Sequence, residues 1–177
     1  MKAVDQGVGP GAPARYQVTP RTLIFLYSSS PATGKREVLL LRGAPNKRLW
    51  ANHFNGIGGH VEPDEDVYAA ARRELAEEAG ITGVDLTLRG VINIAVHPEA
   101  IPPTGVMVFV FCAQVEERTF HAGAEGALAW IPLDELHRHP LVDDLYTLLP
   151  LLDEGQGLIF GHYTPQADGA MAMTFHT

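Results

Sequence analysis

One stretch of 23 residues, Gly59 to Ile81, constrains the fold of this chain more than any other: "GHVEPDEDVYAAARRELAEEAGI". Asp64 or Asp66 is suited to cap a helix that runs to about Ala79, and Gly80 is suited to end it. Apolar residues recur at helical spacing and are expected to face a core: Tyr68, Ala71, Leu75 and Ala79. The stretch therefore predicts an amphipathic helix that packs against another layer.

Three glutamates stand out on this helix. Glu74, Glu77 and Glu78 fall within one arc of about 100°, next to the apolar arc. Like charges at this spacing destabilise a helix by a few tenths of a kcal/mol, and close carboxylates raise each other's pKa. A divalent cation removes that cost, and all-oxygen ligands suit Mg²⁺ or Mn²⁺. Taken alone, the three residues are better explained by an ordinary acidic solvent-exposed face, and the metal site stays open as the alternative.

The spacing of the whole stretch is more specific than the glutamates alone. From Gly59 it resembles the Nudix box, G-x5-E-x7-R-E-U-x-E-E-x-G-U with U aliphatic, at every fixed position. Nine such positions coincide by chance in far fewer than roughly one in a million chains. The resemblance implies an α/β (α+β) fold, with an α/β/α sandwich around a mixed, curved sheet. It also implies a phosphohydrolase that uses Mg²⁺ or Mn²⁺ to cleave a diphosphate linked to another group, X.

The resemblance also implies roles for individual residues in this stretch. The glutamates of the helix correspond to the family's metal-binding and general-base cluster, and which of them is the base is left open. The main-chain oxygen of the preceding glycine corresponds to a further metal ligand. The arginine and the first glutamate are expected to orient the cluster. In this sequence the cluster is Glu74, Glu77 and Glu78, the preceding glycine is Gly58, and the orienting residues are Arg73 and Glu65.

The flanking segments resemble a subgroup, the MutT-like oxidised-purine nucleoside triphosphatases. In "FNGIGGHVE", Asn55 corresponds to the residue that contacts the purine, although a turn with the following glycine explains it as well. In "EGALAWIPLDEL", Glu125 precedes Trp130 as an extra metal-binding glutamate does, and the alternative is a loop carboxylate. In "LVDDLYTLLPLL", Asp143 and Asp144 correspond to a base-reading pair, and ordinary helix caps are the alternative.

Some flanking residues depart from the subgroup. His60 stands where a lysine is usual, and Leu141 stands where a base-stacking tryptophan is expected. Trp50 or Phe54, from the loop before the box, is expected to supply the stacking surface instead. Arg42, at a strand end, is expected to replace a phosphate-contacting lysine of the subgroup. Thr22, in the purine pocket, and the Gly59–His60 pair are the remaining expected substrate contacts.

Two rival functions stay open. Pro98 lies 17 residues past Ile81, near the place where ADP-ribose and nucleoside-diphosphate-sugar pyrophosphatases often carry a proline. A catalytically silent Nudix module that senses a nucleotide is the rival from another class. Loss of the box glutamates would favour that module, and all of them are present.

Composition narrows the partners. A formal net charge of −8, with only three lysines, disfavours polymeric nucleic acid and leaves a small nucleotide bridged by a cation as the expected partner. No apolar run approaches the roughly 20 residues of a membrane span, and the N-terminus lacks a secretory h-region. The single Cys112 rules out an internal disulfide and reads as a buried thiol. We therefore expect a cytoplasmic monomer or homodimer.

The chain reads as one domain. Residues 1–14, rich in Gly, Pro and Ala, are expected to form a flexible arm, and residues 15–177 the folded domain. Strands are predicted at 22–29, 36–43, 84–97, 105–115 and 127–133, with a closing hairpin over 157–164 and 170–177. A helical turn is predicted at 133–137, and a second helix at 143–155.

Overall fold

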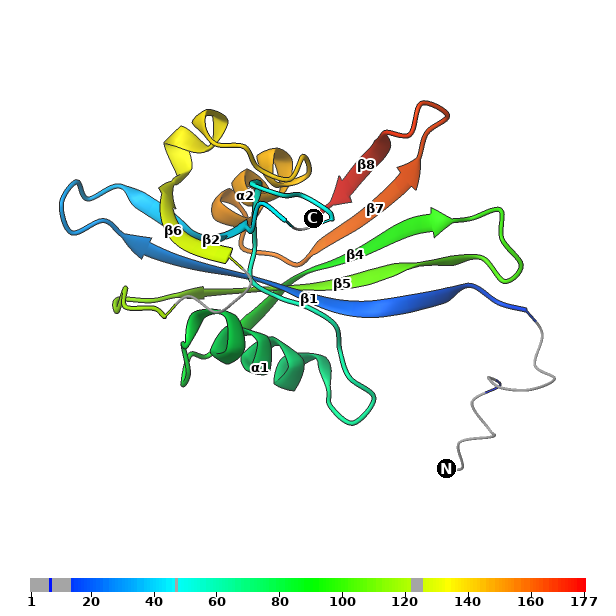
Figure 1. Ribbon diagram of the computed structural model, residues 1–177, viewed down its shortest axis with the longest axis horizontal. Coiled ribbons are helices and arrows are strands. Elements are labelled where there is room, and N and C mark those ends of the chain that lie inside the picture. The colour runs from blue at the N-terminus through cyan, green and yellow to red at the C-terminus, as the bar shows by residue number, and fades with distance from the viewer. Residues whose placement is uncertain (1–6, 8–13, 47, 122–125) are drawn as a thin grey trace.

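The computed structural model describes residues 7, 14–46, 48–121 and 126–177. The elements in chain order are β1 (Gln17–Ser29), β2 (Arg36–Gly43), β3 (Phe54–Asn55), α1 (Val67–Ala79), β4 (Thr87–His97), β5 (Thr104–Gln114), β6 (Gly126–Pro132), the 3-10 helix η2 (Leu133–Arg138), α2 (Leu145–Glu154), β7 (Ile159–Pro165) and β8 (Met171–His176). Figure 1 shows the long central strands crossing the molecule, with α1 on one side and α2 with η2 on the other.

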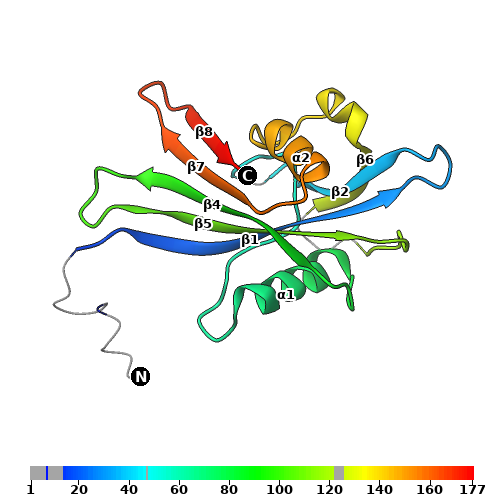
Figure 2. The ribbon, with the colours of Figure 1, turned by 180° about the vertical axis from the view of Figure 1, so that it is seen from behind.

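The described strands form one eight-stranded mixed sheet. Its order is β3-β2-β1-β5-β4-β7-β8, and β6 pairs with the far side of β2. The β1–β5 and β4–β7 pairs are parallel, and the other pairs of named strands are antiparallel. Seen from behind, the same sheet again separates the helices (Figure 2). The α+β class and the sandwich of helices around a mixed sheet are therefore confirmed.

Helix α1 begins and ends where local chemistry allows. The Asp66 side chain accepts hydrogen bonds from the amides of Tyr68 and Ala69, and Gly80 ends the helix with φ of 67°. A left-handed residue at this position favours glycine, which has no Cβ to clash. The buried face of α1 packs on the sheet through Ala71, Leu75 and Ala79, as the helical spacing predicted. Tyr68, which was also predicted to face the core, is 36% exposed and only its ring edge meets Phe111.

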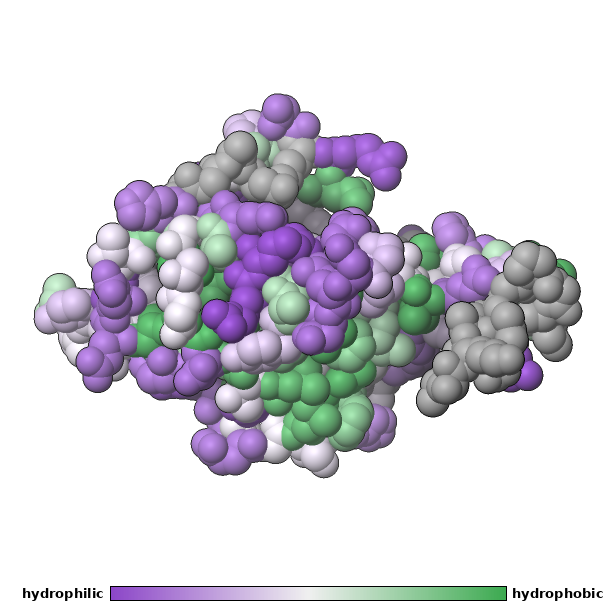
Figure 3. All heavy atoms as spheres, turned by 90° about the horizontal axis from the view of Figure 1, so that it is seen from below, coloured by the Kyte–Doolittle hydropathy of each residue, from purple (hydrophilic) through white to green (hydrophobic). Residues whose placement is uncertain are grey.

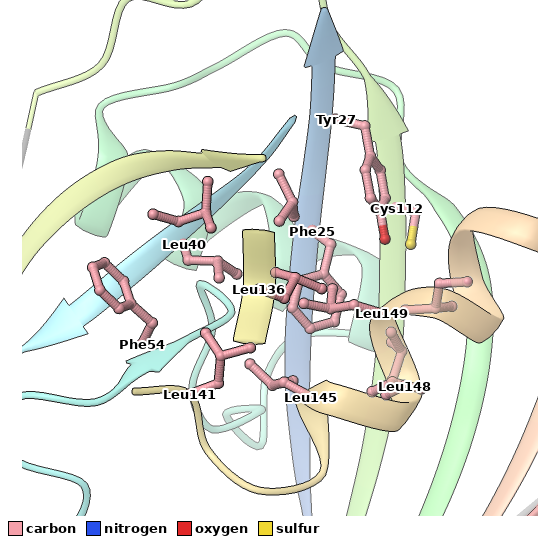
Figure 4. Close-up of a cluster of buried hydrophobic side chains, with 14 of the residues drawn as sticks. Phe25, Tyr27, Leu40, Phe54, Cys112, Leu136, Leu141, Leu145, Leu148 and Leu149 are labelled. Atoms are coloured by element: carbon pink, nitrogen blue, oxygen red, sulfur yellow. The ribbon is translucent and has the colours of Figure 1, made fainter. Parts of the chain in front are cut away.

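Two apolar cores fill the two sides of the sheet, because successive residues of each strand face opposite ways. On β1, Ile24 and Leu26 belong to the core under α1, whereas Phe25 and Tyr27 belong to the core under α2. Figure 4 shows the second core, in which the leucines of α2 meet side chains from β1 and β2. These two cores pack α1 and α2 onto opposite sides of the sheet.

The strand and helix predictions are largely confirmed, with differences at the boundaries. β1 begins at Gln17 rather than Thr22, because its first residues pair in parallel with β5 from Gln17↔Thr104 onward. The segment predicted as an irregular loop contains the two-residue strand β3. α2 begins at Leu145, two residues later than predicted. Most of the expected arm, residues 1–14, lies outside the described residues. No helix among the described residues is long and apolar enough to cross a membrane.

Candidate active site

Arg73 ties the carboxylates of the box together on α1. Its guanidinium donates to Glu65 from Nε at 3.1 Å and from Nη2 at 2.6 Å. Nη1 donates to Glu74 at 2.9 Å and to Glu77 at 3.2 Å, and Nη2 also reaches the His60 carbonyl at 2.9 Å. The hydrogen bond from Arg73 holds the pKa of Glu65 below its usual range. One side chain therefore orients three carboxylates and the start of the box.

Glu78 occupies a different position from the other glutamates. It is only 6% exposed, and its Oε2 accepts a 3.0 Å hydrogen bond from the Gly58 amide. Gly58 has φ of 148°, and a Cβ there would lie 2.2 Å from the Thr22 carbonyl oxygen. Only glycine fits that backbone. The glycine-rich segment thus brings a peptide group against the buried carboxylate of α1.

Gly59 provides room for a second carboxylate. A Cβ at this position would lie 2.3 Å from Oε1 of Glu74. Because Gly59 has no side chain, the Glu74 carboxylate lies directly against the backbone, in a space that we call the cradle. Figure 3 shows the surface on the α1 side, where hydrophilic residues gather beside an apolar area.

The donor set fits a hard divalent cation in its chemistry. Carboxylate and carbonyl oxygens are the ligands that Mg²⁺ and Mn²⁺ prefer, and the cradle at Gly59 brings Glu74 against the backbone beside Gly58. In residues 14–46, 48–121 and 126–177, no three His, Cys, Asp or Glu side chains converge on a single point as arranged. Arg73 forms ion pairs with both Glu74 and Glu77, at 2.9 and 3.2 Å. A cation would compete with Arg73 for these two carboxylates.

One edge of the sheet gathers residues that are far apart in sequence. Phe54 forms a parallel bridge with Leu141, and the Val142 amide donates to the Phe54 carbonyl at 3.0 Å. Because the two segments run parallel, Asn55 and the Asp143–Asp144 pair leave them at the same end. Sequence resemblance named these residues individually, and the fold brings them to one edge.

Asp144 is not an ordinary helix cap. It occupies the cap position of α2, but its side chain makes no capping hydrogen bond. Instead it accepts a 3.1 Å hydrogen bond from the Tyr163 hydroxyl on β7. Burial is the main cause that raises the pKa of Asp144 above its usual value. Asp143, by contrast, is exposed.

Tyr163 is a residue that the sequence analysis missed. It is 4% exposed, and its ring packs edge-on against Phe175 at 5.7 Å between centroids. Burial, followed by the neighbouring Asp144, raises the pKa of its hydroxyl. A tyrosine in a closing hairpin carries no local signal, because only the parallel β4–β7 pairing places it near α2.

Asn55 is half-buried, and its Oδ1 accepts a 2.8 Å hydrogen bond from the next amide, that of Gly56. This is the local turn that the sequence analysis weighed as an alternative. The bond uses the acceptor and fixes the side chain. Among the residues that the structure describes, Nδ2 of Asn55 has no hydrogen-bond partner, so the donor is available to a ligand.

The expected stacking and phosphate contacts are placed unevenly. Phe54 is 8% exposed and lies in the α2-side core, edge-on to His139. Trp50 is 51% exposed in the loop before β3. Arg42 is engaged locally: Nε donates to the Asn52 carbonyl at 3.3 Å, and the guanidinium lies 5.9 Å from the Phe54 ring centroid. Of the two aromatic candidates, Trp50 is the accessible one.

Three further residues were predicted to contact the substrate or the metal: Thr22, His60 and Glu125. Thr22 is 3% exposed, and its Oγ1 has no hydrogen-bond partner among the described residues. His60 is exposed at the start of the box. Glu125, the expected extra metal ligand, lies outside the described residues.

Burial raises the pKa of the Cys112 thiol to about 12, so this cysteine is a core residue, not a nucleophile.

Comparison with known proteins places these features in a family. The NUDIX domain model matches residues 20–152. An oxidized purine nucleoside triphosphate hydrolase from Danio rerio is 34% identical over 114 residues, which cover 64% of this chain and 70% of that protein.

Solved structures share the fold. A MutT protein from Bacillus halodurans superimposes with a TM-score of 0.72 at 22% identity, covering 89% of this chain and 97% of its own. The NUDIX domain of Shewanella oneidensis NrtR, solved with ADP ribose, gives a TM-score of 0.66 at 16% identity, covering 87% and 98%.

Proposed function

The chain belongs to the NUDIX domain family and is a Nudix hydrolase, and we propose that it cleaves a nucleoside triphosphate to the monophosphate and pyrophosphate with Mg²⁺ or Mn²⁺. The observation that carries this proposal is the carboxylate cluster of α1. Glu78 is buried against the Gly58 amide, and Arg73 orients Glu65, Glu74 and Glu77. A helix with a purely structural role does not need so many carboxylates around one arginine side chain.

The cation would be held by Glu74, Glu77 and Glu78 with the Gly58 carbonyl, and by Glu125. A bound divalent cation neutralises phosphate oxygens and makes water a better nucleophile. The chain itself contributes position and proton transfer. One of the three helix glutamates accepts the proton of the attacking water, and Arg73 keeps the carboxylates aligned. Glu78, which accepts from the Gly58 amide at 3.0 Å, is the most buried of them.

The second part of the proposal is an oxidised purine as the base, in a role that clears damaged nucleotides from the cytoplasm. The relative from Danio rerio has this activity in its name. In this chain, Asn55 offers a free amide donor, and Asp144 is held by Tyr163 at the same edge of the sheet. An acid whose pKa is raised by burial donates in its protonated form and accepts in its ionised form. Such groups read the altered edge of an oxidised ring.

An ADP-ribose or nucleoside-diphosphate-sugar pyrophosphatase is the second candidate, and a silent nucleotide-sensing module is the third. Pro98 supports the second, since it lies in the turn directly after β4 at the spacing described above. The NrtR domain solved with ADP ribose shares the fold alone at 16% identity. The intact carboxylate cluster argues against the silent module.

A substrate panel tests the proposal. Turnover of 8-oxo-dGTP, dGTP, ADP-ribose, a nucleotide sugar and a dinucleoside polyphosphate would be measured with Mg²⁺, with Mn²⁺ and after exhaustive chelation. We expect 8-oxo-dGTP to give the highest kcat/KM, with monophosphate and pyrophosphate as products and no turnover after chelation. Preference for ADP-ribose would transfer the assignment to the second candidate. Binding of a nucleotide without turnover of any compound would favour the sensing module.

A further inference from the structure

Arg21 lies on β1, one residue before Thr22, and belongs to the side of the sheet that carries α2. The alternation along β1 decides this, because Phe25 and Tyr27 are in the α2-side core and Leu23 packs against it. Arg21 has the same parity as these three residues and is half-buried. It is therefore a cation set into the same face as Asp144 and Tyr163.

The guanidinium of Arg21 has no protein partner. Its Nε is buried without a hydrogen bond, and Arg21 forms no ion pair or hydrogen bond with any residue in the described part of the chain. This is unexpected in a chain with 21 acidic residues against 13 basic ones. A buried donor without an acceptor costs free energy, and an arginine is charged at every accessible pH. An anionic ligand removes that cost.

Arg21 lies next to the first residues of the Nudix box. Arg21 forms an antiparallel bridge with His60, and the neighbouring Thr22 amide donates to the Gly59 carbonyl at 2.9 Å. Side chains directly across an antiparallel pair lie about 5 Å apart on one face. Arg21 thus stands beside the first residues of the box, across the backbone from the cradle that holds Glu74.

We propose that Arg21 binds a phosphate oxygen of the substrate's polyphosphate chain and that it, rather than Arg42, supplies the arginine contact to the phosphates. This inference deepens the proposed function and rests on it for the identity of the substrate. The planar fork of an arginine offers parallel N–H donors that match two oxygens of one phosphate, and Nε is one of these donors. Arg42 already donates through its own Nε to the Asn52 carbonyl.

Inorganic tripolyphosphate separates the phosphate contact from the base contact. Its Kd would be measured by calorimetry in Mg²⁺ buffer for the wild type, Arg21→Gln and Arg21→Lys. The matched control is Arg15→Gln, which removes the same charge at an exposed position, roughly 20 Å away along an extended chain. We expect Arg21→Gln to weaken binding by about 10- to 100-fold, as loss of a charge-assisted hydrogen bond does. Arg21→Lys should fall between, and Arg15→Gln should match the wild type.

Thermal melting without ligand distinguishes binding from a structural role. Because the buried Nε has no partner, Arg21→Gln should melt at or above the wild-type temperature. Equal Kd values for the wild type and Arg21→Gln, undetectable binding by the wild type, or a fall in Tm that accompanies the loss of binding would each overturn the inference. If Arg21 governs tripolyphosphate binding but no nucleoside triphosphate is hydrolysed, the proposed substrate fails and the anion contact stands. If triphosphates are hydrolysed but the Kd values are equal, the reverse holds.

Discussion

The two sides of the sheet hold their polar residues in different ways. On the α1 side, the carboxylates lie within 14 consecutive residues, Glu65 to Glu78, and Arg73 bonds to three of them. On the α2 side, Asp144 and Tyr163 come from two segments that only the tertiary fold brings together, and Asn55 leaves β3 at the nearby edge of the sheet. The first region is assembled by one helix and the segment just before it, and the second by strand pairing.

This difference separates the reaction from the choice of substrate. The helix and the glycine-rich segment before it hold the carboxylates within one short stretch of the chain, so the chemistry stays with the motif. Residues on the α2 side come from loops and from the last strands, so a substitution there leaves that helix intact. We expect variants on the α1 side to lower turnover of every substrate, and variants on the α2 side to lower it for some substrates only.

The largest effect is expected for Glu78→Gln. Removing the charge of the buried carboxylate that accepts from the Gly58 amide should lower kcat by at least about a hundredfold, a typical scale for one well-placed catalytic group. Steady-state kinetics with Mg²⁺ measures this, and circular dichroism checks the fold. Glu62→Gln, an exposed residue of the same stretch, is the matched control. A near-native kcat for Glu78→Gln would remove it from the cluster, and unfolding would make it a structural residue.

A smaller and selective effect is expected for Asp144→Asn. It should lower kcat/KM for the best purine triphosphate by about 10- to 100-fold, since a buried hydrogen-bonding group discriminates strongly. Its stability effect has the opposite sign. An acid whose folded pKa is raised costs stability once the pH rises above the unfolded value near 4, and that cost grows until the pH passes the folded pKa.

The control for this variant is Asp85→Asn, at an exposed position. Thermal melts at pH 7 should show Asp144→Asn at or above the wild-type Tm, with the advantage shrinking as the pH falls toward 4. A lower Tm at pH 7 together with unchanged kinetics would show that the Asp144–Tyr163 pair only holds α2 against β7.

The smallest effect is expected for the acid stability of Arg73→Gln. The pKa of Glu65 is lowered in the folded protein by its hydrogen bond to Arg73. The stability from this pair is therefore present above the unfolded pKa and is lost as the pH falls through the folded one. The pair is partly exposed, so a Tm difference of a few degrees is expected at pH 7. The difference between the two proteins should shrink as the pH falls below the unfolded pKa, and a constant difference at every pH would contradict the linkage.

The sequence predicted the local parts of this molecule and missed the parts set by distant pairing. The cap at Asp66 and the end at Gly80 follow from residue chemistry within the helix, so both were predicted. Tyr163 and Arg21 were not, because a tyrosine or arginine in a strand carries no signal until its neighbours are known. The phosphate role predicted for Arg42 rested on its place at a strand end, and its bond to the Asn52 carbonyl could not be read from that place.

The separation of reaction and substrate choice is tested most directly by one ratio, kcat/KM for 8-oxo-dGTP over that for dGTP. It would be measured with Mg²⁺ for the wild type, for Arg73→Gln on the α1 side and for Asp144→Asn on the α2 side. We predict that Arg73→Gln lowers both values by the same factor and leaves the ratio unchanged, and that Asp144→Asn reduces the ratio by about tenfold or more. A ratio that falls in Arg73→Gln and persists in Asp144→Asn would contradict the division of roles between the two sides of the sheet.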